Sequence, residues 1–132
     1  MADAGATVKA RILVVDDSSL VRLYYRSALE QAGFGVEQAI NGIEAMERVL
    51  SQPFDLVIVD VNMPRMDGFT FLRVLRSGAT DVATLPVLMV STESGVQDIA
   101  EARTSGANFY LVKPVAEAEL VRHVCVLTGT AA

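Results

Sequence analysis

The sequence predicts an α/β protein in which a single parallel sheet is covered by helices on both faces. Apolar residues make up 52% of the 132-residue chain, whereas aromatic residues make up 6% and tryptophan is absent, a composition suited to an aliphatic core. Five short apolar runs alternate with longer segments of helical period. Because repeated strand-helix-strand units give parallel strands, this alternation predicts five parallel strands in a three-layer arrangement.

The expected strands are short runs that are rich in Val, Ile or Leu in most cases. They span residues 11–16, 34–39, 55–60, 86–91 and 109–113. The first, third and fourth runs are almost continuously apolar, as strands buried on both faces should be. The second run contains Glu37 and Gln38, which favours a place at the edge of the sheet.

Five amphipathic helices are expected between and after these strands. Apolar residues recur at helical intervals over residues 21–32, 43–50, 71–75, 96–103 and 120–127. Gly33 ends the first pattern, Pro53 follows the second and Gly78 closes the third. The fourth pattern is weaker and ends near Gly106.

Length and charge narrow the class of protein. We expect one domain over residues 9–128 with flexible ends at 1–8 and 129–132, and no room for a separate DNA-binding domain. The net charge of −5, with scattered basic residues, disfavours nucleic-acid binding. No apolar run reaches the roughly 18 residues of a membrane helix, and no signal peptide is evident. A cytoplasmic protein without membrane contact is therefore expected.

Charged and hydroxyl side chains close four of the five expected strands. Asp16 and Asp17 end the first, Asp60 the third, Ser91 the fourth and Lys113 the fifth. An Asp at one strand end commonly reflects its preference for turns. However, sites in open parallel sheets form beyond the carboxyl ends of the strands, so these five side chains should meet in one cleft.

Three carboxylates at close range repel one another unless a cation joins them. Oxygens from Asp17, Asp60 and a nearby backbone carbonyl, completed by water, suit Mg²⁺, with Mn²⁺ as a substitute. No His or Cys lies close in sequence, which disfavours zinc. With Lys113 and the Ser91 hydroxyl at the same edge, such a site could bind a phosphoryl group, and Asp60 becomes a candidate nucleophile.

The segments ILVVDDSS, VDVNMPRMDG, LPVLMVST and LVKP occur in this order at characteristic spacings. Together they resemble a bacterial response-regulator receiver domain, and more narrowly the CheY-like, stand-alone chemotaxis type. The resemblance covers nearly the whole chain. It implies a flavodoxin-like (βα)5 fold with strand order 2-1-3-4-5.

The resemblance further implies that Asp60 accepts a phosphoryl group from the phosphohistidine of a sensor histidine kinase, a CheA-like protein in chemotaxis. It assigns Ser91 and Lys113 to the phosphoryl oxygens. The implied Mg²⁺ ligands are Asp16, Asp17, Asp60 and the backbone carbonyl of Asn62.

A switch is also implied by the resemblance. On phosphorylation Ser91 would swing towards the phosphate and Tyr110 would turn inward. These movements would remodel the face made by the fourth expected helix, the fifth strand and the fifth helix. The implied target is a downstream protein such as a flagellar motor switch protein. Ser91 stands where Thr is commoner in the family, which keeps the hydroxyl group.

The remaining implications concern the loops around the site. The Lys113–Pro114 peptide bond is implied to be cis. Asn62 and Glu93 are candidates for setting the lifetime of the phosphate, and a phosphatase is a further candidate partner. We expect a monomer, although the sequence does not determine whether phosphorylation induces dimerisation.

Other functions fit the sequence to different degrees. A phosphate sink or a phosphorelay intermediate would share all of this chemistry. An Asp-nucleophile phosphatase is disfavoured, because it needs a second carboxylate where Asn62 stands, and an amide cannot transfer the proton. A flavodoxin-type nucleotide module is disfavoured by Asp16 and Asp17, which replace a phosphate-binding loop. We therefore expect a signalling switch that catalyses its own phosphorylation and dephosphorylation only.

Overall fold

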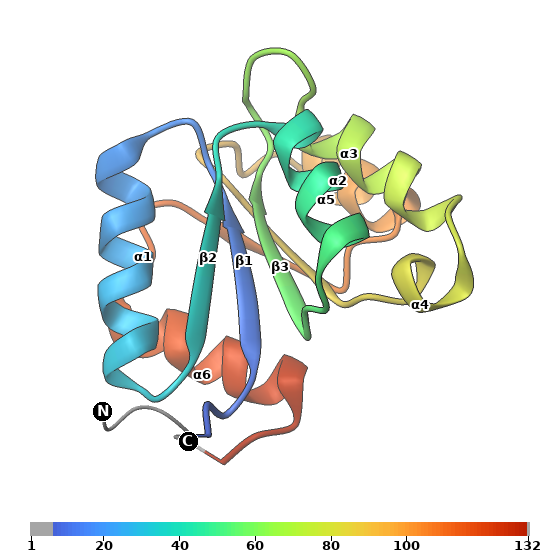
Figure 1. Cartoon of the computed structure of the whole chain (residues 1–132). Helices are drawn as coiled ribbons and strands as arrows, with labels where there is room; N and C mark the ends of the chain where they lie inside the picture. The colour runs from blue at the N-terminus through green and yellow to red at the C-terminus, as the bar shows by residue number, and fades with distance from the viewer. Residues whose placement is uncertain (1–6, 132) are drawn as a thin grey trace.

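The computed structural model describes residues 7–131 (Figure 1). Its centre is one parallel sheet in the order β2-β1-β3-β4-β5. The strands are β1 (Arg11–Val15), β2 (Gly35–Ala39), β3 (Leu56–Asp60), β4 (Val87–Ser91) and β5 (Phe109–Val112). The predicted strand order and the edge position of the second strand are confirmed. Most of the ends expected to be flexible, residues 1–6 and 132, lie outside the described residues.

The described part of the chain contains six helices. They are α1 (Ser19–Gln31), α2 (Gly42–Ser51), α3 (Gly68–Arg76), α4 (Thr80–Ala83), α5 (Val96–Ser105) and α6 (Glu117–Thr128). The five predicted helices are present, and α4 is an additional single turn that the sequence did not predict. None of the helices within residues 7–131 has the length and apolar character that a bilayer span requires.

Two apolar cores lie on opposite faces of the sheet, because successive strand residues point to opposite sides. Ile12, Val14 and Ile58 face α1 and α6. Leu13, Val15 and Val59 face α2, α3 and α5. Figure 1 shows the resulting three layers, and the central strands β3 and β4 are buried along their whole length.

Side-chain caps fix the three loops that follow β1, β2 and β3. Ser18 Oγ accepts a hydrogen bond from the Val21 N–H at the start of α1 (3.3 Å). Asn41 caps α2 and Asp67 caps α3, through N–H···O bonds of 2.9 and 2.8 Å. Each cap satisfies a backbone donor that the helix itself leaves unpaired. The loops at the carboxyl ends of these strands are therefore anchored by the helices they lead into.

Candidate functional site

The three aspartates predicted at the strand ends lie together. Asp16 directly follows β1, and Asp60 is the last residue of β3; both are buried, whereas Asp17 is exposed. One carboxylate oxygen from each residue lies within 4.8 Å of the others. The carboxyl ends of β1 and β3 are adjacent because the two strands pair directly.

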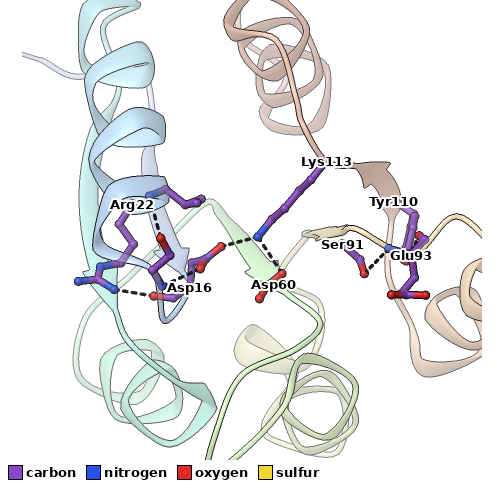
Figure 2. A network of polar contacts seen from close by, with 9 residues as sticks. Asp16, Arg22, Asp60, Ser91, Glu93, Tyr110 and Lys113 are labelled. Carbon is purple, nitrogen blue, oxygen red and sulfur yellow. Dashed lines mark hydrogen bonds and ion pairs between the residues drawn. The ribbon is translucent and has the colours of Figure 1, made fainter.

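Lys113 joins two of these carboxylates (Figure 2). Its Nζ donates to Asp16 Oδ2 at 2.9 Å and forms an ion pair with Asp60 Oδ1 at 3.1 Å. Lys113 comes directly after β5, and its peptide bond to Pro114 is cis. The lysine therefore reaches across the sheet from β5 to the ends of β3 and β1.

The charges at this edge are unbalanced. Burial raises the pKa of Asp60, and the nearby Asp16 carboxylate raises it further, while Lys113 acts in the opposite direction. Burial opposes the charge on Lys113, but its contacts with Asp16 and Asp60 outweigh that effect and raise its pKa. Two of the three carboxylates thus contact a single ammonium group, and the raised pKa means that Asp60 ionises less readily than a solvent-exposed aspartate.

The donor set fits a hard divalent cation. It consists of carboxylate oxygens, with Asp17 at the exposed side of the cluster and the buried Asp16 and Asp60 behind it. Asp16 is already oriented, because its Oδ1 accepts from the Ser18 N–H (2.9 Å) and its Oδ2 from Lys113. Oxygen ligands and room for water on an exposed side are what Mg²⁺ prefers. Asn62, two residues beyond Asp60, lies on the exposed loop after β3.

Ser91, Glu93 and Tyr110 form a chain of hydrogen bonds next to this cluster (Figure 2). Ser91 ends β4 and is fully buried, and its Oγ accepts from the Glu93 N–H at 3.0 Å. The Glu93 carbonyl oxygen accepts from the Tyr110 hydroxyl at 2.8 Å. The residue predicted to contact the phosphate is thereby linked through the β4–α5 loop to the aromatic residue on β5.

Two glycines allow the β3–α3 loop to pack tightly. A Cβ atom at Gly68 would collide with the carbonyl oxygen of Asp60. At Gly42, a Cβ atom would lie 2.7 Å from the Met66 carbonyl oxygen, which accepts from the Gly42 N–H at 3.1 Å. The loop that follows Asp60 is therefore held from both sides by backbone that only glycine permits.

Arg22 is a residue at this site that the sequence reasoning missed. Its Nη1 donates to the Asp16 carbonyl oxygen at 2.7 Å (Figure 2). Its Nε donates to Gln38 Oε1 at 2.9 Å. The available signal was an arginine on the first turn of a helix that begins directly after an acidic pair.

Tyr25, a buried residue of α1, lies close to the charges of the acidic cluster. Burial raises its pKa to about 12, and the charges of Lys113 and Asp16 also act on it. With Lys113, Pro114 and other residues it lines an apolar cleft of about 460 Å³ between α1 and the loop after β5. The Lys113 side chain therefore lines this cleft, while its ammonium group contacts the carboxylates of Asp16 and Asp60.

The fold and the acidic strand-end cluster define a receiver domain, the regulatory module of two-component signalling proteins. Residues 12–125 match the response regulator receiver domain family, and the chain belongs to that family. Members of the family take a phosphoryl group from histidine kinases, bind downstream targets and bind Mg²⁺ at an acidic pocket.

Curated relatives of the chain are response regulators. It is 39% identical over 120 residues to the response regulator MprA of Mycobacterium ulcerans, covering 91% of this chain and 50% of that protein. It is 39% identical over 125 residues to the transcriptional regulatory protein PrrA of Mycobacterium tuberculosis, covering 95% and 52%. The chain thus spans about half the length of these relatives.

Solved structures give a similar result at nearly full length. The chemotaxis response regulator CheY4 of Vibrio cholerae is 36% identical with a TM-score of 0.85, and the match covers 92% of this chain and 99% of CheY4. The receiver domain of the Francisella response regulator 1452 is 28% identical with a TM-score of 0.84, covering 91% and 97%. The predicted membership of the receiver family and the predicted fold are both confirmed.

Proposed function

We propose that this chain is a switch that accepts a phosphoryl group on Asp60 in a Mg²⁺-dependent reaction. The observation that carries the proposal is the position of Lys113, whose Nζ lies within hydrogen-bonding distance of both Asp16 and Asp60. A lysine at this point supplies positive charge beside the carboxylate that would bear the phosphoryl group. An isolated strand-end aspartate without these neighbours would have no such role.

In the proposed reaction an oxygen of the Asp60 carboxylate bonds to the phosphorus of a phosphohistidine on a sensor histidine kinase. The bond between phosphorus and the imidazole nitrogen breaks, and its electron pair stays with the imidazole. Lys113 and the Ser91 hydroxyl would then bind phosphoryl oxygens. Such transfer depends on positioning and on neutralising charge, and the strand ends supply both.

The cation would be held by Asp16, Asp17, Asp60 and the backbone carbonyl of Asn62. When bound, Mg²⁺ neutralises negative charge on the phosphoryl group. Asp60 is the last residue of a buried strand and is itself buried, so its carboxylate is held rigidly for attack. Asn62 and Glu93 flank the position of the phosphate and are proposed to govern access of the water that removes it.

The switch would run through Ser91 and Tyr110. For the Ser91 hydroxyl to turn towards a phosphate on Asp60, it must give up the hydrogen bond from the Glu93 N–H. The Glu93 carbonyl also accepts the hydrogen bond of Tyr110, so movement of this loop would alter the contact of Tyr110 on β5. The face made of α5, β5 and α6 is therefore the proposed output surface.

For the output we propose chemotaxis, with a CheA-like kinase as the donor and a flagellar motor switch protein as the target. The support is the similarity to CheY4 across nearly all of that protein. The similarity to PrrA favours a second candidate, control of transcription as part of a longer chain. Binding of the phosphorylated chain to a purified motor switch protein would favour the first, and absence of binding would favour the second or a phosphate sink.

Intact-mass measurement after incubation with acetyl phosphate and Mg²⁺ tests the phosphorylation itself. The expected result is a single phosphoryl adduct on the wild-type chain that is absent in Asp60→Asn and in a sample treated with EDTA. An adduct that persists in Asp60→Asn would contradict the proposal. Asp67→Asn is a suitable control, because Asp67 caps α3 and is not part of the acidic cluster.

A further inference from the structure

Arg22 connects three parts of the fold through one guanidinium group. The side chain leaves the first turn of α1 and donates to the Asp16 carbonyl oxygen at 2.7 Å (Figure 2). It also donates to Gln38 Oε1 at 2.9 Å. Gln38 belongs to β2, the edge strand that pairs with β1. The arginine therefore fixes the β1–α1 loop to the helix after it and to the neighbouring strand.

The group that Arg22 holds is the peptide unit between Asp16 and Asp17. This unit is planar and rigid, so fixing its oxygen also fixes the backbone from which the Asp17 side chain departs. The Asp16 carboxylate has direct support from Ser18 and Lys113. Among residues 7–131, the structure gives the exposed Asp17 carboxylate no hydrogen-bond partner, so its direction depends on the backbone.

We propose that Arg22, held in place by Gln38, is a positioning residue for the divalent-cation site. It orients the Asp16–Asp17 peptide unit and thereby directs the Asp17 carboxylate towards the ion. The inference rests on the proposed function, because it requires that Mg²⁺ binds at the acidic cluster. Groups that orient metal ligands are important for affinity, and their loss commonly weakens metal binding about 10- to 100-fold.

If Arg22 acted only through its positive charge, its removal would have the opposite effect on Mg²⁺ binding. The guanidinium group is a cation bound to the backbone of the acidic pair, and by Coulomb's law alone its removal would strengthen binding of Mg²⁺. Loss of orientation, in contrast, would weaken binding. The sign of the change in Arg22→Met therefore distinguishes a positioning role from an electrostatic one.

Two further variants separate orientation from charge. Gln38→Ala leaves every formal charge in place but removes the partner that holds the guanidinium group. Arg22→Lys keeps the positive charge, but one ammonium on a flexible chain does not reproduce the two-directional contact of the planar guanidinium group. Arg26→Met is the matched control, because Arg26 lies one turn further along α1 and pairs with Glu30 on the exposed surface.

The experiment is calorimetric titration of the full chain with MgCl₂. We expect Arg22→Met to weaken binding about 10-fold and Gln38→Ala about 3-fold, with Arg26→Met within about 2-fold of wild type. The variant that combines Arg22→Met and Gln38→Ala should bind Mg²⁺ about as weakly as Arg22→Met alone, because both changes disrupt the same contact of Arg22 with the Asp16 carbonyl oxygen. At saturating Mg²⁺, the phosphoryl adduct should form to the wild-type extent.

Unfolding midpoints in urea without Mg²⁺ show whether each variant is folded. If Arg22→Met is not folded, Gln38→Ala provides the test. Unchanged or tighter binding in Arg22→Met, or unchanged binding in Gln38→Ala, would overturn the inference while leaving the proposed function intact. Absence of Mg²⁺ binding in the wild-type chain would overturn both.

Discussion

The two ends of the sheet differ in how their charged side chains are paired. At the carboxyl ends of the strands, three carboxylates lie together, and the ammonium group of Lys113 contacts two of them, Asp16 and Asp60. Near the amino ends of β4 and β5, the guanidinium group of Arg76 donates five hydrogen bonds, to the carbonyl oxygens of Ala83, Leu85 and Gly106 and to the side chain of Asn108. The acidic cluster is short of positive charge, whereas Arg76 is a cation whose donors are fully used.

This difference indicates which end can respond to a ligand. Arg76 joins α3 to the end of α4, the segment before β4 and the loop between α5 and β5, so these segments are held in one arrangement without a ligand. At the acidic end, burial and repulsion raise the pKa of Asp60, and an added cation would relieve that repulsion. The stable end therefore holds the frame in place while the acidic end can bind, react and change.

The largest predicted change in stability is at the end of the sheet that Arg76 holds. Arg76→Met should destabilise the protein by about 3 kcal/mol, because it leaves several partly buried carbonyl groups without donors. Urea unfolding measures this change. Arg73→Met is the control, since Arg73 pairs with Glu101 on the exposed surface and should cost less than about 1 kcal/mol. Similar small losses in both variants would contradict the contrast between the two ends.

The second prediction concerns the acidic end, where Mg²⁺ should increase stability. At a concentration about 100 times the dissociation constant, the free energy of unfolding should rise by about 2.7 kcal/mol, because the ion binds the folded state. Thermal unfolding with and without MgCl₂ checks this. Asp17→Asn should lose most of the increase, and an increase of equal size in that variant would exclude Asp17 as a ligand.

The third prediction is that Asp60→Asn stabilises the Mg²⁺-free protein at neutral pH. The pKa of Asp60 is higher in the folded protein than in the unfolded chain. The contribution of Asp60 to stability is therefore fully present below the unfolded pKa and is lost as the pH rises through the folded pKa. At neutral pH the ionised Asp60 is therefore unfavourable, and the amide should gain on the order of 1 kcal/mol. The gain should shrink as the pH falls towards about 4. Lower stability of Asp60→Asn at neutral pH would contradict this account.

The smallest predicted effect is at Arg65, on the loop after Asp60. This residue has a φ of 72°, in the left-handed region that costs a non-glycine residue about 1–2 kcal/mol. Glycine relieves the strain but adds backbone entropy to the unfolded chain. Arg65→Gly should therefore increase stability by roughly 0.5 kcal/mol in urea unfolding. A loss of more than that amount would show that the arginine side chain makes a favourable contact.

Sequence reasoning predicted the parts of the site that come from strand ends. Asp16, Asp17, Asp60 and Lys113 each follow or close an apolar run, and parallel topology brings such ends to one edge. The metal-ligand, switch and phosphate-lifetime roles assigned to Asn62, Ser91, Glu93 and Tyr110 remain predictions.

The parts that sequence reasoning missed depend on contacts between distant segments. The single turn α4 has neither a side-chain cap nor a buried residue, so no apolar period marks it. The contacts of Arg22 and Arg76 end mostly on backbone carbonyl oxygens, whose positions follow from the fold and leave no pattern in residue types. The two arginines looked like ordinary charges on amphipathic helices.

The central claim is that Asp60 carries the phosphoryl group, and reductive trapping tests it most directly. Borohydride reduces an aspartyl phosphate to homoserine, which tandem mass spectrometry locates in the sequence. After treatment with acetyl phosphate and Mg²⁺, we predict homoserine at position 60, and no conversion when EDTA replaces Mg²⁺. Homoserine at position 16 or 17 instead, or a phosphoryl adduct that yields no homoserine, would contradict the account.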